Sequence, residues 1–280
     1  MFEYIFRGLL NGTVYALLAL PMTLMFTTAA TVDFAIGAYA LLAAAVATAI
    51  PGPLGIAAGL SSALLASGVM AVVFVLLKRT SKEGIRVALA SFGLSLAISS
   101  IVLIVWGTKP FVRQTFATVF EFGALRVNPQ GLLNGLVALC LVGLTWLVIK
   151  RTQLGRMMRA AAANPSGAEL AAIPVIGVQC GTLLAGGLLG GIAGLLILHS
   201  SGMDFTASLG LTFIGFAAAI IFGIHSPLRC LAGGLAIGVI EALSAGYTSG
   251  MVTSMVPSLF MLIVLLSGQL GAGRYSGDRP

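Results

Sequence analysis

The chain has 280 residues, of which 59% are hydrophobic and only 8% are charged, and its net charge is +7. Ordinary soluble domains carry about 25% charged residues, so this composition excludes a soluble globular protein. The basic residues lie in short loops rather than on one patch, which gives no reason to expect a nucleic-acid partner. The 36 glycines suit helices that approach closely in lipid. The sequence therefore predicts an all-α, polytopic bundle of transmembrane helices forming a single domain over residues 1–280.

Apolar runs follow one another along the chain, with short polar segments between them. A helix that crosses the bilayer needs about 20 residues, so the runs predict about 8–9 membrane spans. The second run and the last three are short enough to be half-helices or tightly packed crossings. The first run is too long and too weakly basic for a cleaved signal peptide, which makes it a retained span. The predicted runs are 8–26, 34–50, 54–77, 87–107, 132–149, 181–199, 209–224, 231–245 and 256–268.

Basic residues divide unevenly between the two sides that nine crossings define. Eleven of the fifteen Lys and Arg residues fall on one side, in segments 78–86 and 150–159, at Arg229 and in the tail after residue 268. By the positive-inside rule that side faces the cytoplasm. The C-terminus is therefore predicted to be cytoplasmic and the N-terminus external.

Two short motifs hint at an internal symmetry. Val32-Asp33-Phe34 opens the second run from the inside, and Met203-Asp204-Phe205 precedes the seventh run from the outside. Runs that cross in opposite directions after similar motifs are typical of the inverted repeats of transporters. An Asp-Phe dipeptide also arises easily by chance, so both readings stay open at this point.

Segment 150–174 contains a basic island that separates two apolar runs. Residues 154–163 are rich in Ala, Met and Arg and predict a helix, which Asn164-Pro165 interrupts. A second turn is expected from Ser166, with Glu169 as its capping-box partner and Pro174 as its end. The basic side chains either anchor the loop at the membrane or contact a partner. Anchoring is the favoured interpretation for two of them and contact for the other two, which lie three residues apart on one helical face: Lys150 and Arg151, and Arg156 and Arg159.

Catalytic and metal-binding patterns are absent from the sequence. It contains no G-x-x-x-x-G-K-[ST] phosphate loop, no H-E-x-x-H motif and no G-x-S-x-G elbow. His199 and His225 lie far apart at predicted membrane edges, and the three cysteines have no metal-like spacing. We therefore predict no catalytic residues, no cofactor, no metal and no enzymatic activity for the chain.

A few polar residues within or beside the apolar runs are candidates for a translocation path. A polar group at lipid depth usually faces a partner or a wet cavity, because an unpaired one costs several kcal/mol. Glu241 can instead bond a neighbouring helix or lie in a wet interface, and close helix packing explains Ser91 and Ser95 at least as well. For Glu241 we place the structural alternative slightly ahead. The candidates are Asn11, Asp33, Ser91, Ser95 and Glu241.

A family resemblance runs through five segments in their order along the chain, namely residues 12–20, 32–39, 91–107, 152–168 and 216–241. These segments resemble the permease subunits of branched-chain amino acid-type ABC importers, the shorter of the two permease types. Residues 12–20 resemble the family's opening N-G-x-x-Y-A-L-x-A-L, and 91–96 with Trp106-Gly107 resemble its T-x-G-L-S-L…WG span. Residues 152–168 are similar to its cytoplasmic T-x-x-G-R-A-x-R-A-x-A-x-N loop, and 216–241 to its F…G…GG…G…E pattern. The family's I-N-F-A-H-G segment falls on 32–39, where its Asn and His are here Asp33 and Ile36.

The resemblance implies a multi-pass permease of the cell inner (plasma) membrane that moves a small polar solute, with branched-chain or other amino acids first. It implies cytoplasmic ABC ATPase subunits, an external solute-binding protein and a second permease, with a heterodimer favoured over a homodimer, besides membrane lipid. ATPase coupling is then expected at five positions of the 150–174 loop: Gly155, Arg156, Arg159, Asn164 and Glu169. The changes at Asp33 and Ile36 leave urea, short amides and small carboxylates open as solutes. The alternative function is a self-sufficient secondary transporter or channel for such solutes, which requires ionisable residues at mid-membrane, where the chain offers mainly Glu241.

Overall fold

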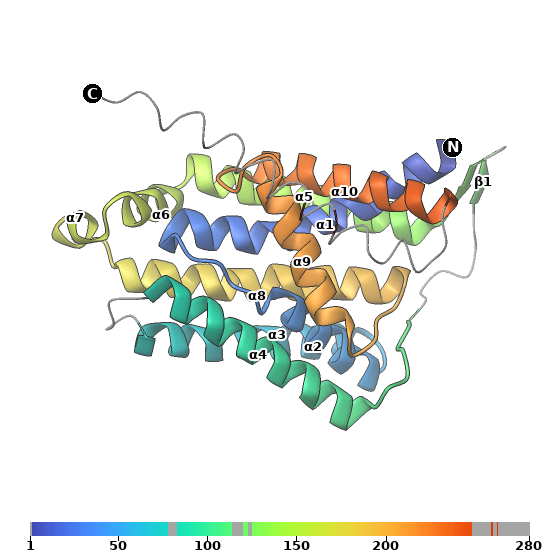
Figure 1. Ribbon diagram of the computed structural model, residues 1–280, viewed down its shortest axis with the longest axis horizontal. Helices are drawn as coiled ribbons and strands as arrows, with labels where there is room; N and C mark the ends of the chain where they lie inside the picture. Colours follow the sequence, from blue (N-terminus) through green and yellow to red (C-terminus); the bar gives the residue numbers. More distant parts are fainter. Residues whose placement is uncertain are drawn as a thin grey trace.

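The computed structural model describes residues 2–77, 83–113, 120–122 and 125–247, together with residues 259 and 262. The described part of the chain is helical apart from one antiparallel hairpin of two three-residue strands (Figure 1). The elements, in order, are α1 (Phe2–Ala29), α2 (Ile36–Ala49), α3 (Pro53–Leu77), α4 (Glu83–Trp106), β1 (Phe120–Phe122), β2 (Leu125–Val127), α5 (Pro129–Arg151), α6 (Gln153–Ala163), α7 (Pro165–Leu170), α8 (Val175–Ser200), α9 (Ala207–Ile220) and α10 (Pro227–Tyr247).

Six of these helices are long and apolar enough to cross a membrane, namely α1, α3, α4, α5, α8 and α10. Helices α2 and α9 are equally apolar but have 14 residues each, which is roughly 21 Å of helix against a hydrocarbon core of about 30 Å. They are therefore half-length. The sequence allowed this for four short runs, and α2 and α9 correspond to two of them. The ninth predicted run, 256–268, lies outside the described residues except for Leu259 and Leu262, which are helical. The expected count of 8–9 spans is not confirmed.

The most extensive helix–helix contact in the described residues joins α1 to α10, and glycines make it possible. Gly8 and Gly12 on α1 face Gly234 and Gly238 on α10, so each helix offers two glycines four residues apart. A Cβ atom added at Gly12 would lie 2.7 Å from the Gly234 carbonyl oxygen. Small residues at such spacing let helix backbones meet closely in lipid, where van der Waals packing replaces the hydrophobic effect. The N-terminal and C-terminal helices of the described chain are thereby held together.

We expect Gly234→Ala to destabilise the bundle by about 3 kcal/mol or more, because its new Cβ would overlap the backbone of Ala16. Gly93→Ala on α4 is the matched control, since a Cβ there meets no atom within 4 Å. Denaturation of the two purified variants in detergent measures the difference. Equal stability of the two variants would contradict the close contact.

Two breaks of equal length precede the half-length helices. Six residues, 30–35, separate α1 from α2, and six residues, 201–206, separate α8 from α9. In each break an aspartate accepts a hydrogen bond from the backbone N–H two residues later. The Asp33 Oδ1 accepts from Ala35 N, and the Asp204 Oδ1 accepts from Thr206 N, both at 2.9 Å. The two Asp-Phe motifs therefore occupy the same position relative to the helices they introduce.

The helices on either side of these breaks also contact one another in matching pairs. Helix α1 lies beside α8 and runs in the opposite direction (Figure 1). Each of the two touches the half-length helix that follows the other, α1 with α9 and α8 with α2, and α2 touches α9. The contact of α1 with α10 has its counterpart in that of α8 with α3. The half-length helices thus contact each other, and each packs against one of the two long antiparallel helices.

Candidate functional site

Helices α6 and α7 lie at one end of the bundle, beyond the end of α1 (Figure 1). The chain reverses sharply between α5 and α6, and Gly155 is the residue that allows it. A Cβ atom at Gly155 would overlap the Ile149 carbonyl group, so only glycine fits at this position. The Thr152 hydroxyl caps α6 by accepting a bond from Gly155 N at 3.3 Å. The helix predicted at 154–163 is confirmed as α6, which begins one residue earlier than predicted.

The two arginines singled out on α6 differ in what they contact. Arg156 is exposed, and among the described residues it makes no ion pair. Arg159 is exposed as well, but its Nη1 donates to the Ile149 carbonyl oxygen at the end of α5. Lys150 lies 5.1 Å from the centroid of the Trp146 ring, a position that suits anchoring at the end of a span. Arg156 is therefore the arginine most free to bind a partner, whereas Arg159 also braces α6 against α5.

The capping expected for the second turn is wrong. Helix α7 begins at Pro165, and its N-cap is Asn164, whose Oδ1 accepts from Gly167 N at 3.0 Å. Ser166 is inside the helix, so Glu169 is not its capping-box partner and is instead exposed. The helix ends at Leu170, and Pro174 caps the next helix rather than ending this one. Helix α7 begins at Asn164-Pro165 because asparagine is a strong N-cap and proline fits the first helical position.

Three of the predicted path residues meet where the half-length helices begin. Asp33 is 3% exposed, and Ser91 and Ser95 on α4 are fully buried. The Ser91 hydroxyl accepts from Phe34 N at 2.9 Å, and the Ser95 hydroxyl lies 3.0 Å from that of Ser208 on α9. The four-residue spacing of the two serines on one face of α4 is confirmed. The two serines join α4 to Phe34, just before α2, and to α9.

A threonine that the sequence did not single out completes this polar junction. The Thr212 hydroxyl on α9 accepts from Gly37 N on α2 at 3.0 Å, and it lies 3.2 Å from the Phe34 carbonyl oxygen. Gly37 is required there, because its Cβ would overlap the backbone of Ser208. Polar contacts between α2 and α9 therefore hold the two half-length helices together, with no charged partner for Asp33 among the described residues.

Removing the Asp33 carboxylate tests how far the junction depends on it. Oδ1 accepts from Ala35 N, and Oδ2 accepts from the Tyr39 hydroxyl at 3.2 Å. Asp33→Leu leaves both donors unpaired, which we expect to lower the free energy of unfolding by about 2–3 kcal/mol. Asp33→Asn keeps an acceptor and should lose less than half of that. Equal losses for Leu and Asn, measured by denaturation in detergent, would contradict this role.

The other two path candidates, Asn11 and Glu241, lie at the end of the bundle opposite α6. Asn11 and Tyr15, one helical turn apart on α1, line a cavity of about 200 Å³ beside the C-terminal end of α8. The Tyr15 hydroxyl interacts with the carboxylate of Glu241 on α10. The second carboxylate oxygen, Oε2, is buried without a hydrogen-bond partner among the described residues. The other residues lining the cavity are Val14, Ile197, Ser200, Ser201, Gly202, Met203, Ala207 and Leu211.

The structure therefore divides the predicted residues into three groups. Asn11 and Glu241 lie near one cavity, the α4 serines and Asp33 form the junction, and the 150–174 positions lie at the far end. Sequence reasoning missed Tyr15, although its spacing of four residues from Asn11 places both on one helix face. It also missed Ser208 and Thr212, whose partners are more than a hundred residues away.

Membrane-length helices packed through small residues around a polar junction define a polytopic integral membrane protein. The chain belongs to the family described as branched-chain amino acid transport system / permease component, whose model matches residues 4–265. The resemblance in the five sequence segments is thereby confirmed.

Individual relatives carry related names. The probable branched-chain amino acid transport permease protein LivH of Methanocaldococcus jannaschii is 30% identical, with 92% of this chain and 88% of the relative covered. The high-affinity branched-chain amino acid transport system permease protein LivH of Escherichia coli K12 is 26% identical, with 94% and 92% covered. The nucleoside ABC transporter permease protein NupC of Lactococcus lactis is 30% identical over 49% of this chain and 46% of its own length. No solved structure matches the chain.

Proposed function

We propose that the chain is the membrane-spanning permease subunit of an importer that takes up branched-chain amino acids with ATP hydrolysed by separate subunits. The observation that carries this proposal is the α6–α7 segment, which presents an exposed Arg156 at the end of the bundle where α5 ends and α8 begins. A helix in that place offers a docking surface for an ATPase. The absence of a phosphate loop from the sequence is consistent with an energy source on another subunit.

The proposed orientation places the α6 end in the cytoplasm and the Asn11 cavity outside. Segment 150–159 carries four of the basic residues, which the positive-inside rule assigns to the cytoplasm. A cavity on the outer side would receive solute from an external binding protein. We further propose that a second, related permease completes the pathway, and that this chain resides in the cell inner membrane as a multi-pass protein.

We infer that the chain contains an inverted repeat, with α1–α2–α3 corresponding to α8–α9–α10. The equal six-residue breaks, the matching Asp turns and the paired helix contacts support this inference. Repeats of opposite orientation allow one half to rock against the other and expose a central site to each side in turn. The polar junction between α2 and α9, one of the contacts between the two repeats, is the expected pivot.

Reconstitution with the co-purifying ATPases and binding protein tests the function. We expect ATP-dependent uptake of leucine, isoleucine and valine into proteoliposomes, competed poorly by urea, short amides and nucleosides. Uptake of nucleosides in preference to amino acids would overturn the substrate assignment. Flux through this chain alone, driven by an ion gradient, would overturn the ABC assignment and favour a secondary transporter or channel.

A further inference from the structure

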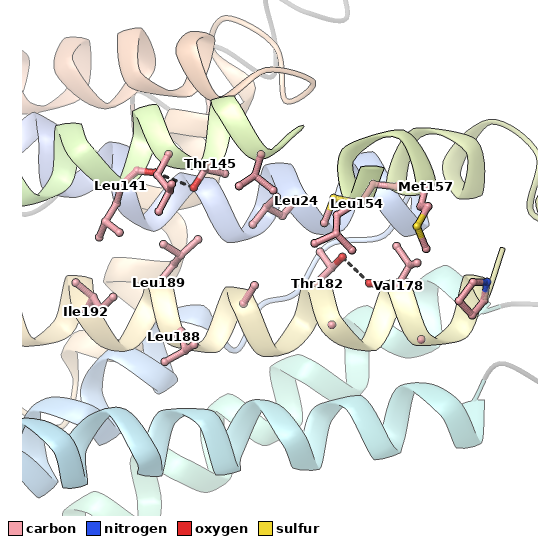
Figure 2. A pocket seen from close by; sticks show the side chains of 17 residues that line it. Leu24, Leu141, Thr145, Leu154, Met157, Val178, Thr182, Leu188, Leu189 and Ile192 are labelled. Carbon is pink, nitrogen blue, oxygen red and sulfur yellow. Dashed lines mark hydrogen bonds between the residues drawn. The ribbon is translucent and has the colours of Figure 1, made fainter. Parts of the chain in front are cut away.

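A deep apolar groove runs between α5 and α8, and it belongs to none of the sites described above. Its volume is about 570 Å³, and Leu24 of α1 contributes to its lining (Figure 2). The residues lining the groove are Leu24, Leu141, Leu144, Thr145, Val148, Leu154, Met157, Met158, Pro174, Gly177, Val178, Gly181, Thr182, Ala185, Leu188, Leu189 and Ile192.

The groove offers hydrocarbon contacts and no free side-chain hydrogen-bonding group. Its two hydroxyl groups are already bonded one turn back along their own helices. Thr145 donates to the Leu141 carbonyl oxygen and Thr182 to that of Val178, both at 2.8 Å (Figure 2). An occupant of the groove is therefore apolar along its length.

The groove is open because α8 lacks large side chains where it faces α5. Gly177, Gly181 and Ala185 recur every four residues along this face. A Cβ atom added at Gly181 would meet no atom within 4 Å. The space is therefore unfilled by this chain's described residues, in contrast to the glycine contacts between α1 and α10.

The dimensions favour a single extended chain over a helix. From Gly177 to Ile192 the lining of α8 extends roughly 22 Å, at about 1.5 Å per residue. A helix of that length and about 10 Å diameter occupies roughly 1,700 Å³. The empty volume of the groove, open space at its mouth included, is only about 1280 Å³. One leaflet of the hydrocarbon core is about 15 Å deep, so a lipid acyl chain of that leaflet can follow most of the groove.

The mouth of the groove at the α6 end is basic. Arg151 lies three residues from Val148 and three from Leu154, both of which line the groove. Arg151 is exposed and makes no ion pair among the described residues. Lys150 is exposed as well, but it lies over the Trp146 ring, on the face of α5 that does not line the groove. The sequence contains no Asp or Glu between Glu121 and Glu169. Positive charge at the end of a span attracts anionic lipid head groups.

We propose that the groove binds one acyl chain of an anionic phospholipid, whose head group rests on Arg151. Leu154, Met157 and Met158 of α6 would then contact the same lipid as Val178 and Thr182 of α8. The bound lipid would brace α6 against α8, a contact that the protein's own side chains make only in part.

Native mass spectrometry of the purified full-length chain, released from nanodiscs of phosphatidylglycerol and phosphatidylcholine, tests the proposal. We expect the wild-type protein to retain one phosphatidylglycerol, with at least tenfold preference over phosphatidylcholine. Gly181→Phe should lose that lipid, because its ring fills the groove. Gly143→Phe on α5 is the matched control, since its Cβ also meets no atom within 4 Å but it does not line the groove. This control should retain the lipid.

The head-group contribution is tested by Arg151→Gln, which should reduce the preference for phosphatidylglycerol about fivefold. Gly181→Leu provides a second, smaller filling variant, and thermal unfolding in detergent checks that each variant is folded.

Retention of the lipid by folded Gly181→Phe and Gly181→Leu would overturn the proposal. So would equal retention of the two lipids by the wild type. A Leu188→Cys variant that cross-links to a second permease in the complex would assign the groove to a protein partner instead. All of these measurements omit the ATPase, so their outcome is independent of whether the chain is an ABC importer.

Discussion

Replacing Arg156 and Arg159 by Glu should uncouple the permease from its ATPase subunits and reduce ATP-dependent uptake at least tenfold. Arg156 is exposed on α6 at the end of the bundle, so charge reversal turns an attractive contact with an acidic partner into a repulsive one. Because Arg159 also bonds the Ile149 carbonyl oxygen, the single variant Arg156→Glu separates docking from folding. Co-purification of the ATPase with tagged permease measures docking, and vesicle uptake measures coupling.

Lys109→Glu is the matched control for this charge reversal. Lys109 is equally exposed but follows α4, on the side of the membrane opposite α6 in the predicted topology. It should leave ATPase co-purification unchanged. If Arg156→Glu also co-purifies and transports like the wild type, α6 is not the docking helix.

Glu241→Gln should lower uptake roughly 10- to 100-fold while leaving ATPase co-purification intact. The carboxylate interacts with Tyr15, which lines the Asn11 cavity, and its buried Oε2 has no partner among the described residues. We expect that oxygen to bind the ammonium group of the amino acid, and a hydrogen bond to a charged group is worth about 1.5–3 kcal/mol. The loss should appear in proteoliposome uptake of leucine.

Two further variants locate this effect. Tyr15→Phe removes the hydroxyl that orients Glu241, so it should show a smaller loss of the same kind. Glu3→Gln, also on α1, alters a carboxylate whose contact is the half-exposed ion pair with Arg7 at 2.7 Å. It should transport normally. A folded Glu241→Gln variant with wild-type uptake would place Glu241 in a structural role only.

Helix positions could be predicted from the sequence because hydrophobic length is a local property. The runs at 54–77 and 132–149 became α3 and α5 with ends shifted by three residues or fewer. The half-length of α2 and α9 was within the prediction, since their apolar runs were already short for a bilayer crossing. The hairpin of β1 and β2 was not predicted, because three-residue strands contain too little alternation to recognise.

The contacts between distant segments could not be predicted. Ser95 and Ser208 are separated by 113 positions, and Gly37 and Thr212 by 175, so only the packed bundle brings each pair together. The cap of α7 was misassigned because the sequence contains two helix-start patterns here. Ser166 and Glu169 fit a capping box, and Asn164-Pro165 fits an N-cap followed by proline at the first helical position. Proline is favoured at the first helical position, and the Asn164 side chain caps the helix that begins there.

The glycine contact between α1 and α10 has a consequence for how the protein is made. Gly12 meets Gly234, so α1 packs mainly against a helix that is synthesised more than 200 residues later. Synthesis proceeds at about 5–20 residues per second, which separates the two helices by roughly 11 to 44 s. During that interval α1 waits in the bilayer with its glycine face uncovered. Nascent chains that stop short of α10 lack the partner for this face, which makes them natural targets for membrane quality control.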